Sequence, residues 1–211
     1  MKITPSMLPP EVVREVNDEV DAQIESDRKN LNLLKNSFHY FSMFDRITTI
    51  LKCGVADREK INQDILSGKI AQGQCYSRCY HCCSMSLTYE VEAFDVLLSC
   101  WLNRSAVVSA YLSGKFDSDK EWCGMLNDGL CNIHHYKPYV CLLTLPSPMG
   151  AEKGGCYFKG EKNSKTAVHK QTMIVTGKMR LLFKEWLPEV PAFVGTNINQ
   201  GFKWSLKVMK R

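Results

Sequence analysis

Four of the ten cysteines lie within nine positions of one another, in the stretch GQCYSRCYHCCSMS at residues 73–86. They are Cys75, Cys79, Cys82 and Cys83, separated by four, three and one residues. At about 100° per residue on a helix, these positions fall within a sector roughly 100° wide, so a short helix or tight loop could aim all four side chains toward one region. Thiolates bind zinc and iron–sulfur clusters, whereas magnesium and calcium prefer oxygen ligands. The spacing therefore favours a soft-metal site.

A second, looser group of cysteines follows. It consists of Cys123, Cys131, Cys141 and Cys156. Asn127-Asp128-Gly129 is a strong turn signal, and it predicts a small hairpin or knuckle with Cys123 and Cys131 on its arms. Eight cysteines would divide into two four-coordinate sites, or into one cluster and a second site. A simple zinc ribbon fits poorly, because a ribbon pairs its cysteines tightly at both ends and here only the first group is tight.

Histidines and basic residues lie near these cysteines in the sequence. With eight thiols already available, we expect His81, His134 and His135 to be outer donors or surface residues rather than ligands. Arg78 and Lys137 could neutralise thiolate charge, or could simply be solvated on a loop. The sequence has no glycine-rich phosphate loop and no Ser/His/Asp constellation, and nothing singles out a Cys–His nucleophile pair. The catalytic residues, if there are any, are therefore not identified.

The compartment bears on whether the cysteines pair with one another. The first residues, MKITPSMLPPEVVREV, contain no apolar stretch typical of a secretory signal, and no window approaches 18 consecutive apolar residues. We therefore expect a cytoplasmic protein in a reducing environment, where persistent disulfides are rare. The net charge of +5 counts every cysteine as a neutral thiol. Metal-bound cysteines would be thiolates and would offset this positive charge, so the mild basicity gives no clear nucleic-acid signal.

The sequence patterns around the cysteines indicate mostly helical segments. Apolar residues recur at helical spacing over residues 9–52, where Pro9-Pro10 suits a helix start and Gly54 a stop. Further helical patterns cover residues 57–69, 87–105, with Thr88 suited to the N-cap, and 165–186. Cys100 lies among apolar residues of such a pattern and is interpreted as a buried small hydrophobe, whereas Cys53 is left unassigned. The basic, aromatic tail, residues 201–211, is expected to be a solvated terminus.

These patterns predict a mainly α fold, with helical flanks around an irregular cysteine-rich metal-binding core that contains a small β-hairpin. We expect residues 1–72 to form a helical N-terminal extension packed on the core. Residues 73–160 would form the metal-binding core, and residues 161–211 a C-terminal helix and basic tail. At 211 residues, all three parts fit one compact domain.

The two cysteine segments together resemble the YkgJ-like family, described as zinc- or iron-chelating domains. The family pattern is C-x3-C-x2-C-C, followed by C-x-x-L, D-G and C-x-I-Y-x-x-R-P-x-x-C. Here the first part reads C75YSRC79YHC82C83, and the second reads Cys123-Gly-Met-Leu126, Asp128-Gly129 and C131NIHHYKPYVC141. His134, Lys137 and Leu142 depart from the family tyrosine and two family arginines, and a lysine lacks the planar fork of an arginine. Cys156 extends the pattern beyond what the motif covers.

The resemblance implies metal binding by Cys75, Cys79, Cys82, Cys83, Cys123, Cys131, Cys141 and Cys156. The family extends to flagellin lysine N-methylases, which are thought to use an iron–sulfur cluster with S-adenosylmethionine. Three hypotheses follow: a metal-binding protein with an iron–sulfur cluster, preferably of the four-iron type, or zinc; an S-adenosylmethionine-dependent protein-lysine methyltransferase-like enzyme; and a structural zinc adaptor. We also expect a protein partner or a protein substrate.

A second resemblance is local. Cys75-x3-Cys79-x2-Cys82 has the cysteine spacing of radical S-adenosylmethionine enzymes, whose three cysteines leave one cluster iron open. Those enzymes place the motif on a long alternating β/α barrel. The present chain shows no such alternation, so we do not assign it to that superfamily.

Overall fold

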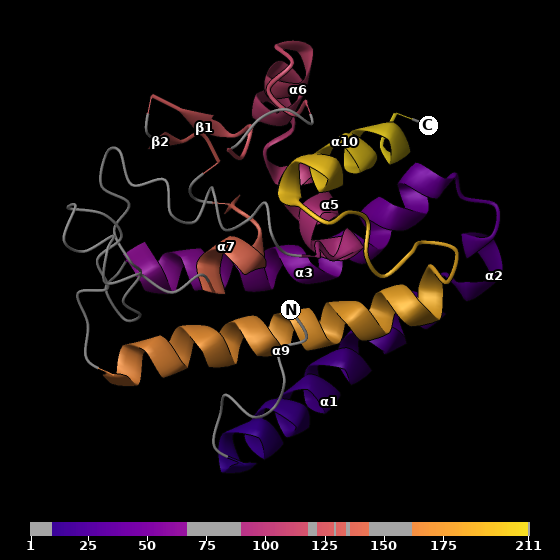
Figure 1. Cartoon of the computed structure of the whole chain (residues 1–211). Helices are drawn as coiled ribbons and strands as arrows, with labels where there is room; N and C mark the ends of the chain where they lie inside the picture. The colour runs from indigo at the N-terminus through magenta and orange to yellow at the C-terminus, as the bar shows by residue number, and fades with distance from the viewer. Residues whose placement is uncertain are drawn as a thin grey trace.

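A computed structural model of the chain describes residues 10–66, 90–117, 122–128, 130–133, 136–143 and 162–210. It is mainly helical (Figure 1). The elements are α1 (Pro10–Asn32), α2 (Lys35–Phe38), α3 (Met43–Leu66), α5 (Ala93–Leu102), α6 (Arg104–Leu112), β1 (Leu126–Asn127), β2 (Leu130–Cys131), α7 (Tyr139–Leu143), α9 (Lys162–Trp186) and α10 (Ile198–Val208).

Helix α9 lies between α1 and α3 and contacts both (Figure 1). The apolar stripe of α1 recurs every three to four residues, and its buried members are Val16, Val20, Ile24 and Leu31. Gly177 of α9 lets the two helices approach, since a Cβ there would come within 3.3 Å of Val20. The long helix predicted over residues 165–186 is thus present and begins three residues earlier.

Helix α5 is the centre of the core. Every residue from Ala93 to Cys100 is buried, and the helix packs against α3, α9 and α10. A helix that is apolar almost all round must be covered on every side, which explains why three helices surround it. Two of its buried residues, Asp95 and Ser99, are polar, and both hold the cysteine segment described below.

Residues 9–52 are predicted to be helical, and most of them are, but the helix is interrupted. The chain turns between α1 and α3, where the short helix α2 places Phe38 in the core with 6% of its surface exposed. Gly54 is also wrongly predicted as a stop, because α3 runs through it to Leu66. The glycine packs against Met179 instead: a Cβ at this position would lie 2.9 Å from Sδ of Met179, so the end of that side chain would have to shift.

The prediction of a solvated C-terminal tail is wrong. Residues 198–208 form α10, which buries Ile198, Phe202 and Leu206 against the core, and Met209 beyond it is buried as well. Complete burial of such a side chain stabilises the fold by about 1.5–3 kcal/mol. The lysines of this segment lie on its other side: Lys203 pairs with Asp117 at 3.1 Å, and the ammonium of Lys210 lies 5.2 Å from the ring centroid of Tyr111.

The helix predicted over residues 87–105 is shorter and interrupted. Glu92 is the N-cap of α5, and Thr88 lies outside the described residues. Residues 91–93 hydrogen-bond to the segment 192–195, so an extended backbone precedes the helix. Helix α5 ends at Leu102 with Asn103 as its C-cap, and α6 begins at Arg104.

Strands β1 and β2 pair antiparallel over two residues each. Leu126 lies opposite Cys131, and Asn127 lies opposite Leu130. Asp128 has φ of 49° in the connection between them, a left-handed conformation that asparagine and aspartate tolerate better than most residues. Cys131 therefore lies on one arm of this ladder, and Cys123 lies just before the other.

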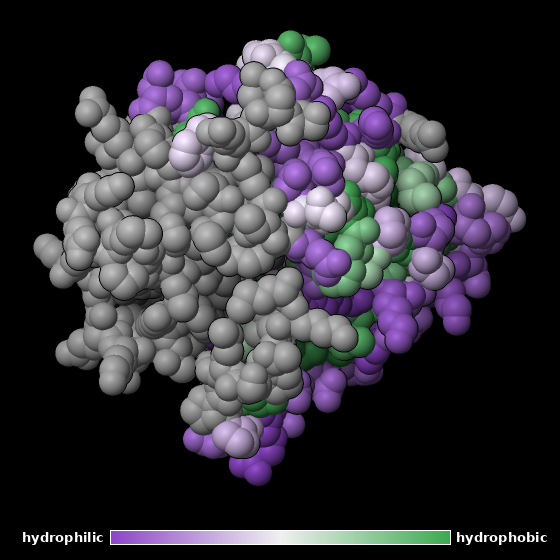
Figure 2. Space-filling view, in the orientation of Figure 1, coloured by the Kyte–Doolittle hydropathy of each residue, from purple (hydrophilic) through white to green (hydrophobic). Residues whose placement is uncertain are grey.

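On the face shown in Figure 2, the described residues are largely hydrophilic, with smaller hydrophobic areas between them. None of the helices in the described ranges combines the length and the apolar character needed to cross a bilayer.

Candidate metal-binding segment

Three of the eight predicted ligands lie in the described part of the chain. Cys123 is buried, and Cys131 and Cys141 are partly buried. The other five, Cys75, Cys79, Cys82, Cys83 and Cys156, lie outside the described residues, as do Arg78, His81, His134 and His135. Within the described residues, no group of three or more His, Cys, Asp or Glu side chains could hold a metal ion.

Cys123, Cys131 and Cys141 belong to residues 122–128, 130–133 and 136–143, called the second cysteine segment below. Its regular structure is limited to β1, β2 and the short helix α7, so some of its backbone groups take their hydrogen bonds from side chains elsewhere in the chain. Buried backbone groups need partners, because an unpaired one costs about 1–3 kcal/mol. Buried polar residues of α3, α5 and α10 supply those partners.

Asp95 of α5 holds the start of α7. Its Oδ1 accepts a hydrogen bond of 2.7 Å from the backbone N–H of Tyr139, and its Oδ2 accepts one of 3.3 Å from that of Val140. A carboxylate at the first turn of a helix satisfies N–H groups that have no partner within the helix. Cys141 follows directly and is fixed by the same turn.

Near the C-terminal end of α5, two side chains bind the carbonyl oxygen of Tyr136. The hydroxyl of Ser99 donates to it at 2.7 Å, and Nδ2 of Asn103 donates to it at 3.2 Å. Asn103 also donates to the carbonyl oxygen of Ser99 at the end of α5. The backbone before Cys141 is thus attached to α5 at two places: at Tyr139 by Asp95, and at Tyr136 by Ser99 and Asn103.

Arg58 of α3 reaches the same stretch from the other side. It is 2% exposed, its Nη2 donates to the carbonyl oxygen of Lys137 at 3.0 Å, and its guanidinium lies 5.2 Å from the ring centroid of Tyr139. The side chain of Lys137 is itself buried, with 8% exposed, so it is not simply solvated on a loop. A buried positive charge of α3 therefore lies next to the turn that carries Cys141.

Asn199 of α10 holds the other end of the segment. Its Oδ1 accepts from the backbone N–H of Gly124 at 2.8 Å, and its Nδ2 donates to the carbonyl oxygen of Trp122 at 3.0 Å. These two bonds flank Cys123. Gly124 is required here because a Cβ would lie 2.5 Å from the carbonyl oxygen of Lys115 and would overlap the ring of Phe116.

The electrostatics of the segment follow from its burial. Burial raises the pKa of Asp95 to about 7, although the N–H groups of Tyr139 and Val140 act in the opposite direction. Burial lowers the pKa of Arg58, and this effect is opposed by Tyr139, Asp95, Tyr136 and Cys141. Negative charge on Cys141 would therefore stabilise the cationic form of Arg58, and Arg58 would in turn stabilise a thiolate there.

The two cysteines excluded from the predicted ligand set lie in helices. Cys100 is fully buried in α5, which confirms its interpretation as a small hydrophobe, and burial raises its pKa to about 12. Cys53 lies within α3, where burial and then Asp27 raise its pKa to about 11. A raised pKa keeps a thiol protonated and therefore a poor metal ligand.

The residues that hold the second cysteine segment were not identified from the sequence. Asp95 gives a signal, because it is a lone carboxylate inside the apolar run AFDVLLSCW. A buried charge of this kind requires partners elsewhere in the chain. Arg58 and Asn199 lie among polar neighbours and give no comparable signal.

Comparison of the chain with protein-family models, with curated proteins and with solved structures found no match.

Proposed function

We propose that the protein is a metal-binding protein in which clustered cysteines coordinate an iron–sulfur cluster or zinc. The proposed ligands are Cys75, Cys79, Cys82 and Cys83, with Cys123, Cys131, Cys141 and Cys156. Membership of the YkgJ-like family is part of this proposal and rests on the double cysteine motif. A cytoplasmic location, which would keep the thiols reduced, and a protein partner belong to it as well.

The observation that carries the proposal is the way the second cysteine segment is held. Five buried or partly buried polar side chains bind its backbone, and they come from α3, from α5 and its C-cap, and from α10: Arg58, Asp95, Ser99, Asn103 and Asn199. Burying polar groups is unfavourable unless each one finds a partner. Metal ligands need such support, because the affinity of a site depends on ligands that are already oriented.

The donor chemistry fits a thiophilic metal. Three thiols lie on one segment, and a buried arginine lies beside the turn that carries one of them. Several thiolates on one metal centre leave excess negative charge, which a nearby guanidinium offsets. When bound, zinc would hold the loops together, and an iron–sulfur cluster would add electron transfer or an open iron.

The experiment is an anaerobic preparation assayed for iron, acid-labile sulfide and zinc per chain, with its absorption spectrum. Bound metal in the wild type is expected to fall sharply in Cys131→Ala, because one thiolate ligand is lost. It should stay unchanged in Cys100→Ala, the matched control, which has a buried thiol outside the ligand set. A preparation with no bound metal, or equal metal loss in both variants, contradicts the proposal.

A further inference from the structure

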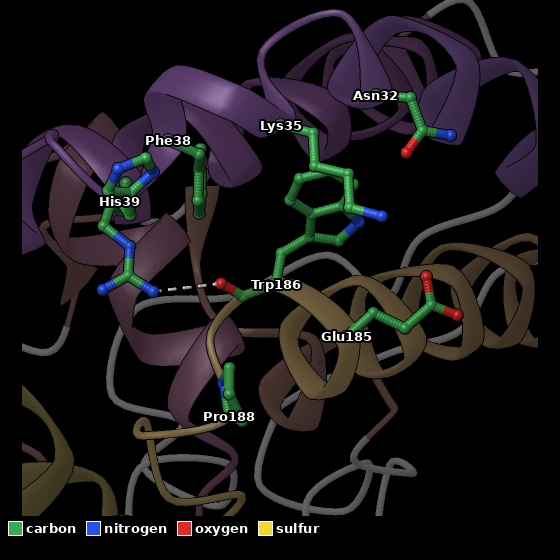
Figure 3. A pocket seen from close by; sticks show the side chains of 8 residues that line it. Asn32, Lys35, Phe38, His39, Glu185, Trp186 and Pro188 are labelled. Carbon is green, nitrogen blue, oxygen red and sulfur yellow. Dashed lines mark hydrogen bonds between the residues drawn. The ribbon is translucent and has the colours of Figure 1, made fainter.

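A hollow separate from the cysteine segment lies where α2 meets the end of α9. Its volume is about 530 Å³, and its walls come from Asn32, Lys35, Phe38 and His39 on one side and from Glu185, Trp186 and Pro188 on the other (Figure 3). Arg46 also lines it. Small-molecule sites occupy about 300–1,000 Å³. The hollow is therefore large enough for a small ligand.

One wall of this pocket is aromatic. The rings of Phe38 and Trp186 meet edge to face, with centroids 5.3 Å apart. The guanidinium of Arg46 lies 5.2 Å from the centroid of Phe38 and fixes that ring further. Figure 3 shows the indole of Trp186 rising from the end of α9 toward Lys35. A partly exposed indole held in this way offers a flat surface for a planar ring.

The positive and negative charges around the pocket do not balance. Glu185 accepts a hydrogen bond of 3.0 Å from Nε of Arg28, and Oε1 of Glu189 lies 2.5 Å from Nη1 of Arg46. Both carboxylates are thereby neutralised. Lys35 has no ion-pair partner anywhere in the chain's described residues, and Asn32 and His39 add further polar groups to the same rim. The uncompensated charge at the pocket is therefore positive.

We propose that this pocket binds a small molecule that combines a planar aromatic ring with a carboxylate or phosphate. The ring lies against Trp186 and Phe38, and the anionic group faces Lys35. Aromatic carboxylates and nucleotides share this chemistry. The inference does not depend on the metal site.

The test uses the indole N–H signals of the four tryptophans in a nitrogen-15 NMR spectrum of the full chain. The Trp186 signal is identified as the one missing in Trp186→Phe. The probes are indole-3-acetate and adenosine 5′-monophosphate, and their neutral counterparts are indole-3-ethanol and adenosine. At least one anionic probe is expected to shift the Trp186 signal at up to about 10 mM, which corresponds to a weak but measurable affinity.

The variant Lys35→Gln removes the charge from an exposed position, so the fold should remain intact. It should weaken binding of the anionic probe by about twofold to fivefold, as expected for one exposed charge pair, and leave binding of its neutral counterpart unchanged. Lys207→Gln, at an exposed lysine of α10, is the matched control and should change nothing. The proposal is overturned if neither anionic probe shifts Trp186. It is also overturned if the neutral counterparts bind equally well, or if Lys35→Gln binds the anionic probe as the wild type does.

Discussion

Nη2 of Arg58 donates a hydrogen bond of 3.0 Å to the carbonyl oxygen of Lys137, which lies 79 residues further along the chain. This bond joins the middle of α3 to the turn before Cys141. Arg58 is 2% exposed, and its guanidinium also covers the ring of Tyr139. A single side chain therefore links a core helix to the backbone that carries a proposed metal ligand.

Arg58→Met should lower the free energy of unfolding by about 2 kcal/mol, because the carbonyl of Lys137 then loses a buried donor. Hydrogen exchange should accelerate in the peptide that covers residues 136–143. Urea unfolding and exchange mass spectrometry measure the two effects.

The control for this change is Arg180→Met, which breaks a half-exposed ion pair with Glu92. It should cost at most about 1 kcal/mol, because exposed pairs contribute little. Equal stability losses in the two variants would show that Arg58 has no special role in holding the segment.

Asp95→Asn should change the dependence of stability on pH. The folded state raises the pKa of Asp95 from 3.8 to about 7, so it binds this proton more tightly than the unfolded chain does. The contribution of Asp95 to stability is therefore largest at low pH, falls as pH rises from about 4 to about 7, and is constant above that range. Asparagine has no such titration.

The measurement compares urea unfolding of the wild type and Asp95→Asn at about pH 5 and about pH 7.5. The stability difference between them should shift in favour of the variant at the higher pH. Asp18→Asn, at an exposed position of α1, should follow the wild type at both values. A difference independent of pH would contradict the raised pKa.

Hydrophobic periodicity was enough to predict the mainly helical fold and the long helices. Val16, Val20 and Ile24 recur at helical spacing, and so do the buried residues of α9. Periodicity could not reveal the turn around α2, because residues 33–42 keep apolar residues at compatible spacing. Gly54 was misinterpreted because a glycine inside a helix has the same sequence signal as one that ends it, and only the approach of Met179 distinguishes them.

The burial of α10 was missed for a different reason. A short basic segment with Phe202 and Trp204 has the composition of a solvated tail, and only its packing against α5, about 100 residues earlier in the chain, explains why it is buried. The supports of the second cysteine segment also depend on contacts distant in sequence. Arg58 and Lys137, or Asn199 and Gly124, have no local pattern that connects them. The spacing of the cysteines predicts ligands, but it cannot predict what holds them.

Lys178→Met should weaken the attachment of α1 to the rest of the fold. Nζ of Lys178 lies 3.0 Å from Oδ2 of Asp27 in α1 and 2.5 Å from Oδ2 of Asp57 in α3, and it also donates to the carbonyl oxygen of Cys53. Burial lowers the pKa of this lysine, but the two carboxylates more than offset the effect and raise it. Without the ammonium, two like charges face each other.

The expected loss is about 2 kcal/mol, because both carboxylates keep partial access to solvent. Lys184→Met, at an exposed lysine of the same helix, should cost less than about 0.5 kcal/mol. Limited proteolysis should cut α1 faster in Lys178→Met than in the control. Identical cleavage in both variants would mean that the buried lysine does not hold α1.

Gly124→Ala tests the packing beside Cys123. The added methyl group would lie 2.5 Å from the carbonyl oxygen of Lys115 and would overlap the ring of Phe116, which is 2% exposed and stacked on Phe202 at 5.4 Å. Neither group can move freely, so the backbone around Gly124 must shift. Overpacking of this kind costs about 1–3 kcal/mol, and the shift should also weaken the bond from the Gly124 N–H to Asn199.

Gly54→Ala is the matched control, because its methyl group would meet only the end of the Met179 side chain, which is flexible. Alanine also favours the helix by about 0.5–1 kcal/mol relative to glycine, so the net change should be small. Urea unfolding measures both variants, and metal content per chain adds a functional readout. Gly124→Ala should lose stability and bound metal together, since Cys123 moves with its neighbour. Wild-type stability in Gly124→Ala would mean that the segment does not pack against Phe116, and full metal content in a destabilised variant would remove Cys123 from the ligand set.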